Sequence, residues 1–325
     1  MIIRTIIDYS IRCKSLLRDL STKENIPVWQ LWIDSIWSFI RYGCTIRQYH
    51  KEFYQYSRLV RNHIFTFRKF KKLVARTNNP SYIYLLSDKA AFNSHFSRFI
   101  TRNWLSSNKM TFEDFDSLCN SKTGIIVKPL GGMEGKDISI ISEESLHSHE
   151  ARLTLFSKLK QDNWIIEEVI KQHPQMIFGN NSVNTIRAIS LMDKENNEIA
   201  IIKTVLRAGV GESFVDNFHQ GGCVYDVDID TGRISSKGIS SESSNIILHP
   251  GTSICMLGYQ IPEWKEVLSV IRKAHQLIPQ CRFISWDIAI TENGVELIEG
   301  NHDGDYDMLE FVGRGMMWPV LKQYL

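Results

Sequence analysis

The sequence predicts an α+β fold, because helical and strand-like segments are mixed along the chain and glycine turns lie inside hairpins. Residues 1–76 carry apolar side chains at helical spacing, whereas short β-branched runs begin at residue 124. Near the C-terminus, apolar runs at 283–290 and 295–301 flank a turn that contains Asn293-Gly294, a pattern typical of a β-hairpin. These observations argue against a doubly wound parallel sheet.

The size and composition are those of a globular protein. A chain of 325 residues, 43% of them apolar, can bury a core divided among two or three subdomains. No apolar run approaches the roughly 20 residues that cross a bilayer, and charged residues interrupt the N-terminal segment where a signal peptide would be apolar. The six cysteines are scattered without a C-x-x-C pair, which favours reduced thiols in a cytosolic protein.

The net charge of +2 hides a strong asymmetry. Residues 1–110 contain 19 lysines and arginines against 6 acidic residues, a balance of +13 that leaves −11 for residues 111–325. A basic N-terminal third could meet an anionic membrane surface, a nucleic acid or an acidic substrate. It could equally be a solvated face, or one that packs on the acidic remainder.

Three helical segments are expected before Asn78-Asn79-Pro80, which breaks the pattern and marks a boundary. The first is amphipathic and covers residues 6–20. The second runs from Val28 to Ile40 after Pro27 and places large apolar side chains at helical spacing: Trp29, Trp32, Ile33, Ile36, Trp37 and Ile40. The third, from Thr45 to about Ala75, ends in a basic, aromatic run that could lie on a membrane or pack within the protein.

The middle of the chain alternates helices and strands. Ser87 or Asp88 is expected to cap a helix that ends near Thr101, and Thr111 begins a short one. Strands are expected at 124–129, 137–141 and 164–170, with a helix capped near Ser142 and ending near Lys160 before the last of them. Strand-like runs follow at 183–192, 198–206 and 222–229, then helices at 264–278 and about 308–325.

The predicted hairpin carries a candidate metal site. Glu299 and Asn301 are two apart, so in a strand both side chains leave the same face, and Asp287 can lie across from them. Two carboxylates and a carboxamide form an oxygen-rich site for a hard cation such as Mg²⁺. Alternatively, Asp287 belongs to a bulge and the other two begin a solvated loop.

Two further groups of residues suit anionic ligands. Lys128 ends a strand and is followed by Gly131, Gly132 and Gly135, whose backbone N–H groups could approach phosphate oxygens, although a flexible hairpin turn would have the same composition. The Walker A spacing is absent. Arg187, Lys203 and Arg207 lie on strand-like runs, and unpaired cations are rarely buried without an anion. Surface cations remain the alternative.

Taken in order, these motifs resemble the ATP-grasp superfamily over roughly residues 85–305. The pattern comprises Lys89, Lys128 with its glycine loop, Glu167-Glu168-Val169-Ile170, Arg187, Arg207, Asn217-x-x-x-Gly221-Gly222 and Asp287…Glu299-x-Asn301. Glu168 through His173-Pro174, with residues 182–187, resembles the sugar-transfer-associated ATP-grasp proteins, which are related to carboxylate–amine ligases that attach glutamate to a ribosomal protein.

The resemblance implies an ATP-grasp fold in which two α+β lobes sandwich ATP. It assigns residues 1–80 to a basic helical region, 81–163 to a small lobe with the glycine-rich loop, and 164–325 to a large lobe with the metal site. Lys89 and Lys128 would contact phosphates, Gly131 to Gly135 would close over them, and Glu167, Glu168, Val169 and Ile170 would form the adenine hinge. Lys203 and Asn217 are counted with the cofactor-binding residues. Asp287, Glu299 and Asn301 would hold one or two Mg²⁺ ions, and Arg187 and Arg207 would stabilise the transferring phosphoryl group.

The implied function is ATP- and Mg²⁺-dependent ligation of a carboxylate to an amine through an acyl-phosphate, in the cytoplasm. The substrates would be a sugar carboxylate or sugar nucleotide and an amino acid, used in surface-polysaccharide assembly. The basic helices are candidates for peripheral membrane contact, and no nucleic-acid partner is expected. The alternatives are a kinase-type ATP-grasp phosphotransferase and a non-catalytic nucleotide-binding subunit. His302-Asp303-Gly304-Asp305 replaces the small residues and Pro-Gly turn of many relatives, which leaves the acceptor pocket open.

Overall fold

The computed structural model describes residues 2–120, 124–131, 138–179, 182–211, 222–240, 245–304, 306, 308–311 and 315–325. The chain divides into two compact units, one formed by Met1–Thr77 with Asp305–Leu325 and the other by Asn78–Gly304. Each is described by itself. The lobe boundaries expected at residues 80 and 163 stay predictions.

The first unit is helical. Its elements are α1 (Ile2–Glu24), α2 (Val28–Tyr42), α3 (Ile46–Lys51), η1 (Phe53–Gln55), α4 (Arg58–Arg61), α5 (Phe67–Thr77), α11 (Met308–Phe311), α12 (Trp318–Leu321) and η7 (Lys322–Tyr324). Leu17, Tyr49 and Phe53 are buried in its core. Glu310 joins the C-terminal segment to this core, because its carboxylate accepts hydrogen bonds from the backbone N–H groups of Phe65 at 2.6 Å and Met317 at 3.0 Å.

Two of the expected helices in this unit are broken. The run from Thr45 to Ala75 contains three α-helices, because Thr45 and Ser57 each accept a hydrogen bond from a backbone N–H and so begin a helix of their own. The expected C-terminal helix is interrupted as well. Met316 has a positive φ of 62°, which a right-handed helix cannot contain.

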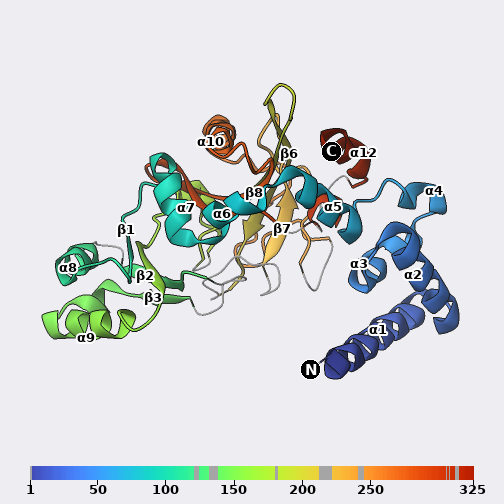
Figure 1. Ribbon diagram of the computed structural model, residues 1–325, viewed down its shortest axis with the longest axis horizontal. Helices are drawn as coiled ribbons and strands as arrows, with labels where there is room; N and C mark the ends of the chain where they lie inside the picture. Colours follow the sequence, from blue (N-terminus) through green and yellow to red (C-terminus); the bar gives the residue numbers. More distant parts are fainter. Residues whose placement is uncertain are drawn as a thin grey trace. The chain divides into compact units, whose positions relative to one another are not determined.

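The second unit contains two antiparallel sheets (Figure 1). The small sheet has the order β1-β4-β2-β3, formed by Trp104–Ser106, Trp164–Glu168, Ile125–Pro129 and Ser139–Ile141. Helices α8 (Phe112–Cys119) and α9 (His149–Leu159) supply the other side of its core. Ser148, rather than a residue near Ser142, caps α9 by accepting a hydrogen bond from the Ala151 N–H at 3.1 Å. Residues Glu143–Leu146 form the 3₁₀ turn η4 instead.

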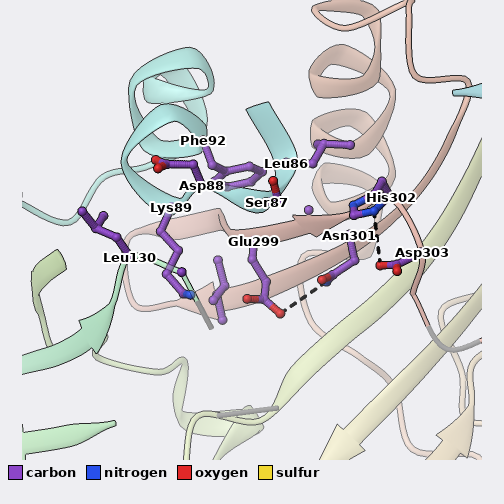
Figure 2. A pocket seen from close by; sticks show the side chains of 13 residues that line it. Leu86, Ser87, Asp88, Lys89, Phe92, Leu130, Glu299, Asn301, His302 and Asp303 are labelled. Atoms are coloured by element: carbon purple, nitrogen blue, oxygen red, sulfur yellow. Dashed lines mark hydrogen bonds and ion pairs between the residues drawn. The ribbon is translucent and has the colours of Figure 1, made fainter. Parts of the chain in front are cut away.

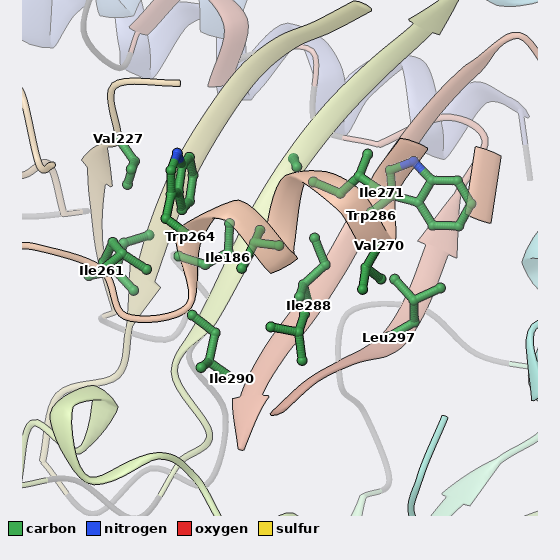
Figure 3. Packing of buried hydrophobic residues seen from close by; sticks show 14 of the residues in the cluster. Ile186, Val227, Ile261, Trp264, Val270, Ile271, Trp286, Ile288, Ile290 and Leu297 are labelled. Carbon is green, nitrogen blue, oxygen red and sulfur yellow. The ribbon is translucent and has the colours of Figure 1, made fainter. Parts of the chain in front are cut away.

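The large sheet has the order β7-β6-β5-β8-β9 and carries the strands that the sequence predicts. They are β7 (Cys223–Asp226), β6 (Ile199–Ala208), β5 (Thr185–Met192), β8 (Phe283–Thr291) and β9 (Gly294–Asn301). Alternate residues of β5 and β8, such as Ile186 and Ile288, point toward helix α10 (Trp264–Gln276) and form the main core (Figure 3). The opposite face of the same strands therefore presents the residues between them, including Arg187 and Asp287.

Short helices lead into the site. These are η2 (Pro80–Tyr82), α6 (Tyr84–Ser87), α7 (Lys89–His95), η3 (Ser97–Phe99) and, after the small sheet, η5 (Pro174–Met176). Asp88 caps α7, as expected, by accepting a hydrogen bond from the Ala91 N–H at 2.8 Å. The helix ends at His95 rather than near Thr101, because Phe96 leaves helical geometry and packs edge-on against Trp286 with ring centroids 5.4 Å apart.

Candidate functional site

The hairpin β8–β9 places the three predicted metal ligands at one end of the large sheet. Asp287 pairs with Glu299, and Ser285 pairs with Asn301. The register shifts between Asp287 and Ile288, so a bulge separates this end from the regular part of the hairpin. The predicted opposition of Asp287 to Glu299 and Asn301 is therefore present, and the bulge that we considered as the alternative is present beside it.

Asp287 lies between two arginines from neighbouring strands. Its side chain is 4% exposed and accepts both Nε and Nη2 hydrogen bonds from Arg187 on β5, with a third from Arg207 Nη1 on β6 at 3.0 Å. Burial alone would raise the pKa of Asp287, but the two guanidinium groups outweigh it and hold the pKa well below its usual range. Asp287 is thus a permanent anion, and we call these three residues the arginine–aspartate cluster.

Glu299 and Asn301 border this cluster and supply further oxygen atoms. Glu299 Oε1 lies 3.9 Å from Arg187 Nη2 and accepts a hydrogen bond from the Asn301 amide at 3.3 Å. Burial and then the neighbouring Asp287 carboxylate raise the pKa of Glu299. Two carboxylates held this close repel each other, and a cation between them would relieve that repulsion.

The donor set fits Mg²⁺ by its chemistry. Across the described residues no group of three or more histidine, cysteine, aspartate or glutamate side chains could hold a metal. Carboxylates with a carboxamide are hard oxygen donors, the kind that Mg²⁺ takes when phosphates complete its shell. Ser285 Oγ, across the strand pair from Asn301, is buried without a hydrogen-bond partner in the described structure and adds another polar group.

A pocket of about 370 Å³ opens beside Glu299 and Asn301. Figure 2 shows Lys89 reaching from the start of α7 toward Glu299, while Leu130 lies on the other side of Lys89. The lining residues come from the α6–α7 turn, the residues after β2 and the end of β9: Leu86, Ser87, Asp88, Lys89, Phe92, Leu130, Gly131, Ile298, Glu299, Gly300, Asn301, His302 and Asp303. The pocket thus brings together Lys89, Gly131, Glu299 and Asn301.

Lys89 links this pocket electrostatically to the small sheet. Burial lowers the pKa of Lys89, the Glu299 carboxylate opposes that shift, and the nearby positive charge of Lys128 adds to it. Glu167 also acts on Lys89. The charge of Lys89 therefore interacts with Glu299 on β9 and with Lys128 and Glu167 on the small sheet.

Lys128 is held by Glu167, one of the predicted hinge residues. Its Nζ donates to Glu167 Oε2 at 2.6 Å, while Arg102 Nη2 and Asn93 Nδ2 donate to Oε1 at 3.0 and 2.8 Å. Burial raises the pKa of Glu167, but Arg102 and Lys128 lower it by more than burial raises it, so the carboxylate remains ionised. The Glu167 side chain therefore holds Lys128, and the assignment of Glu167 to the adenine hinge stays a prediction.

Arg102 joins the two sheets of this unit. Besides Glu167 on β4, it contacts Glu296 on β9, with Nη1 and Oε1 3.5 Å apart, and donates to the Leu297 carbonyl at 2.8 Å. The same Glu296 carboxylate accepts hydrogen bonds from the Thr101 N–H at 2.8 Å and hydroxyl at 2.7 Å. Sequence reasoning missed Arg102, Asn93 and Glu296. The signal for Glu296 was a charge inside an apolar strand, whereas the other two left none.

The rest of the predicted hinge, Glu168 to Ile170, begins at the last residue of β4. The Glu168 and Val169 N–H groups donate to the backbone carbonyls of Asn103 at 3.0 Å and Gly124 at 3.3 Å. The Glu168 carboxylate accepts from the Asn103 N–H at 2.8 Å. Ile170 follows these anchored residues and is half-buried.

Other predicted residues lie apart from the pocket lining or outside the described chain. Lys203 shares the sheet face with Arg207 but forms an ion pair with Asp226 on β7. Gly132, Gly135 and Asn217 lie outside the described residues. His302 and Asp303, expected here only as a departure from relatives, line the pocket, with Nε2 and Oδ1 3.7 Å apart.

Within the described residues, the structure has no helix that is both long enough and apolar enough to cross a bilayer.

Comparisons with known proteins give a family. The family model described as sugar-transfer associated ATP-grasp matches residues 68–324. No curated protein matches the chain. Solved structures similar to it include the ATP-grasp ligase PsnB complexed with minimal precursor, at 13% identity and a TM-score of 0.46, with 76% of this chain and 62% of PsnB covered.

Two further similar structures are more distant. An ADP complex of the N5-carboxyaminoimidazole ribonucleotide synthetase purK has 8% identity and a TM-score of 0.43 and covers 78% of this chain and 60% of purK. A D-alanine–D-alanine ligase from Coxiella burnetii has 12% identity and a TM-score of 0.39, with coverages of 74% and 52%. The chain thus spans less than two thirds of the length of each.

Proposed function

Because this chain belongs to the sugar-transfer associated ATP-grasp family, we propose that it is an ATP- and Mg²⁺-dependent ligase that joins a carboxylate to an amine. The observation that carries the proposal is the pocket of Figure 2, where Lys89, Gly131, Glu299 and Asn301 surround one space. These residues come from three separate segments. A cation, a glycine backbone and metal-type oxygen donors are what a nucleotide triphosphate with its metal requires.

We assign the nucleotide to the space between the two sheets of the second unit. Lys89 and Lys128 contact phosphates, and Gly131, with Gly132 and Gly135, covers them. Glu167 holds Lys128 in place. The backbone beginning at Ile170 hydrogen-bonds the adenine edge, because the N–H groups of Glu168 and Val169 already donate to the carbonyls of Asn103 and Gly124. Lys203 and Asn217 are also assigned to nucleotide binding, without a specific contact.

Asp287, Glu299 and Asn301 would hold Mg²⁺. A bound Mg²⁺ would supply positive charge to phosphate oxygens and align them. The protein's own contribution is the arginine–aspartate cluster. Asp287 fixes the planes of Arg187 and Arg207, so both guanidinium groups are already oriented when the phosphoryl group arrives. Because no reorientation is then required, their charge acts on the transition state at little cost.

The proposed reaction has two steps. A substrate carboxylate oxygen attacks the γ-phosphorus and displaces ADP, which converts a poor electrophile into an acyl-phosphate. The amine then attacks the acyl carbon, loses a proton, and releases inorganic phosphate as the amide forms. Positioning and charge neutralisation supply most of the acceleration, so a protein nucleophile is not required.

We propose a sugar carboxylate, such as a uronic acid, as the donor and an amino acid as the amine, in surface-polysaccharide assembly. The family description is the support for the sugar. His302 and Asp303 at the edge of the pocket are the acceptor-side groups to examine first. A lipid-linked sugar carboxylate would bring the enzyme to the cytoplasmic membrane surface.

The test is a matrix of ADP release in which uronic acids and sugar nucleotides are crossed with amino acids. We expect sustained ADP release only when a carboxylate and an amine are both present, with a product heavier by the amine minus water. Hydroxylamine in place of the amine should trap the acyl group as a hydroxamate. A stable phosphorylated product formed without amine would instead indicate a kinase, and absence of nucleotide binding would indicate a scaffold subunit.

A further inference from the structure

Helix α2 has its apolar side turned outward. Trp29, Ile33 and Ile40 are 62%, 62% and 66% exposed, and Ile36, Trp37 and Phe39 are exposed beside them. The buried positions of the helix are instead Leu31, Ser35, Ser38 and Tyr42. The hydrophobic stripe that normally packs on a core is therefore presented to the exterior. We call Trp29, Ile33, Ile36, Trp37 and Ile40 the α2 apolar face.

An ion pair with a buried arginine fixes this orientation. Asp34 accepts hydrogen bonds from both Nη1 and Nη2 of Arg61 at 2.7 Å, and from the Tyr49 hydroxyl at 2.8 Å. Arg61 also donates to Ser38 Oγ at 3.1 Å, and its side chain is only 6% exposed. Rolling α2 to bury its apolar face would expose these contacts and strand the guanidinium, so the helix is held with its polar side inward.

Arginines border the apolar face. The Arg58 guanidinium lies 5.1 Å from the centre of the Trp37 ring, and the exposed Arg68 donates to the Ile40 carbonyl at 2.8 Å at the C-terminal end of the helix. Arg41 is exposed in the last turn. Residues 1–77 contain 15 lysines and arginines against 5 acidic residues. An apolar centre with a cationic border matches the surface of an anionic bilayer, where acyl chains lie below negative headgroups.

We propose that α2 binds the surface of an anionic phospholipid bilayer, lying in the interface with its apolar face toward the acyl chains. Its 15 residues are too few to span the hydrocarbon core, so it lies along the surface. A second copy of the chain is a poorer occupant, because a two-fold contact through this face would bring like-charged arginines together. The inference extends the proposed use of a lipid-linked sugar substrate, but it does not depend on the ligase chemistry.

The test is sedimentation of the full chain with vesicles, in the absence of substrates. We expect binding to phosphatidylcholine vesicles that contain about a third phosphatidylglycerol, and much weaker binding to phosphatidylcholine alone. The triple variant W29S/I33S/I40S removes exposed side chains and should weaken binding by about tenfold or more. The matched control I177S/L257S removes two exposed apolar side chains from the other unit and should bind as the wild type does.

A second pair of variants separates charge from apolar contact. R41Q/R58Q should weaken binding to the anionic vesicles, whereas R272Q/K273Q, on the exposed side of α10, should not. Circular dichroism and nucleotide turnover verify that each variant is folded. A loss of vesicle binding can therefore be distinguished from a loss of the proposed catalytic activity. Binding that is unchanged in W29S/I33S/I40S, or no wild-type binding to anionic vesicles, would overturn the proposal. A wild-type dimer that dissociates in this variant would also overturn it and assign the face to a second copy.

Discussion

At the scale of single residues, Asp287 is tightly held within the candidate site. Three hydrogen bonds from two arginines occupy a carboxylate that is also assigned to a metal. Both roles are compatible, because a carboxylate has lone pairs for several partners and a cation would approach from the side of Glu299. The consequence is that Asp287 serves two functions, which separate variants must distinguish.

We predict that Glu299→Gln raises the Mg²⁺ concentration needed for half-maximal ADP release and lowers kcat by about a hundredfold or more. This variant is the safer probe of the metal, because 39% of the Glu299 side-chain surface is exposed and its loss leaves no buried guanidinium without an anion. Mg²⁺ titrations of initial rates provide the measurement. Turnover with unchanged Mg²⁺ dependence would contradict the assignment of Glu299 as a ligand.

Asp287→Asn should abolish Mg²⁺-dependent turnover and also destabilise the protein, by about 3–5 kcal/mol, because Arg187 and Arg207 lose their buried counter-ion. Thermal unfolding and turnover below the melting temperature should be measured together. Arg207→Met is the matched variant. It should lower kcat while leaving the Mg²⁺ dependence unchanged, and a shared change in Mg²⁺ dependence would mean that the cluster acts as one unit.

The site residues that could be predicted have partners nearby in the sequence, whereas those that were missed have partners far away in the sequence. Glu299 and Asn301 followed from the two-residue period of a strand, and Asp287 from its place in the other arm of the same hairpin. Arg102 has partners 65 and 194 residues away, at Glu167 and Glu296. Local periodicity carries no information at that separation.

At the scale of elements, a buried histidine joins α10 to the large sheet. The ring of His275 contacts Ser190 Oγ on β5 at 2.6 Å through Nδ1 and the Cys281 carbonyl at 3.0 Å through Nε2. Trp286 Nε1 on β8 donates to the same Ser190 oxygen at 2.8 Å. Nε2 therefore carries the proton and the ring is neutral. Burial lowers the pKa of His275 to about 4.

We predict that His275 makes the folded protein sensitive to mild acid. The unfolded chain binds a proton near pH 6.5 and the folded chain near pH 4, so stability is present above pH 6.5 and falls by about 3 kcal/mol as the pH drops to 4. His275→Gln should lower the stability at neutral pH by about 1–2 kcal/mol and flatten the decline between pH 6.5 and 4.5. Urea unfolding across this range measures both effects.

Carboxylates do not account for a difference between the two proteins in this window. Glu299 and Glu310, whose pKa values are raised, are retained in both proteins and cancel in the comparison. The pKa values of Glu167 and Asp287 are lowered, so their contribution to stability is present above about pH 4 and lost below it. His249, also buried, is retained in both proteins and cancels in the comparison. An unchanged pH slope in His275→Gln would assign the acid sensitivity elsewhere.

The elements themselves were largely predictable, but their orientation was not always. The hairpin β8–β9, the strands of the large sheet and α10 follow closely from periodicity and turn residues. For α2 the period correctly grouped Trp29, Ile33 and Ile40 on one side, yet that side faces outward. Periodicity shows which residues share a face, whereas the ion pair of Asp34 with the buried Arg61 decides which face is inward.

At the scale of the whole molecule, the ATP-grasp fold could be predicted because the order and spacing of the motifs are specific, although each motif alone is weak. The α+β class and the sugar-transfer associated family are both confirmed. The assignment of Gly132, Gly135 and Asn217 stays a prediction, since they lie outside the described residues. The grouping of residues 305–325 with the N-terminal helices was not predictable, because it depends on Glu310 accepting hydrogen bonds from a residue 245 positions away.

We predict that Arg102 makes the two sheets of the second unit unfold together. Arg102→Met leaves Glu167 and Glu296 as buried carboxylates without their shared cation, which should cost about 3–5 kcal/mol. Calorimetry should then resolve the unfolding of the two sheets into separate transitions. Arg152→Met is the control, because the Arg152 ion pair joins α9 to Asp116 of α8, two helices of the same core beside the small sheet. A single, uniformly shifted transition in Arg102→Met would contradict the coupling.

The ion pair of Lys128 with Glu167 affects how strongly common cellular anions can bind. An incoming anion finds in Lys128 a charge that the Glu167 carboxylate, 2.6 Å from Nζ, already neutralises in part. A single inorganic phosphate or sulfate ion gains little from a charge that is already neutralised in part, whereas a nucleotide engages several distant groups at once. Common cellular anions should therefore be weak inhibitors, with no separate gate needed to keep them out.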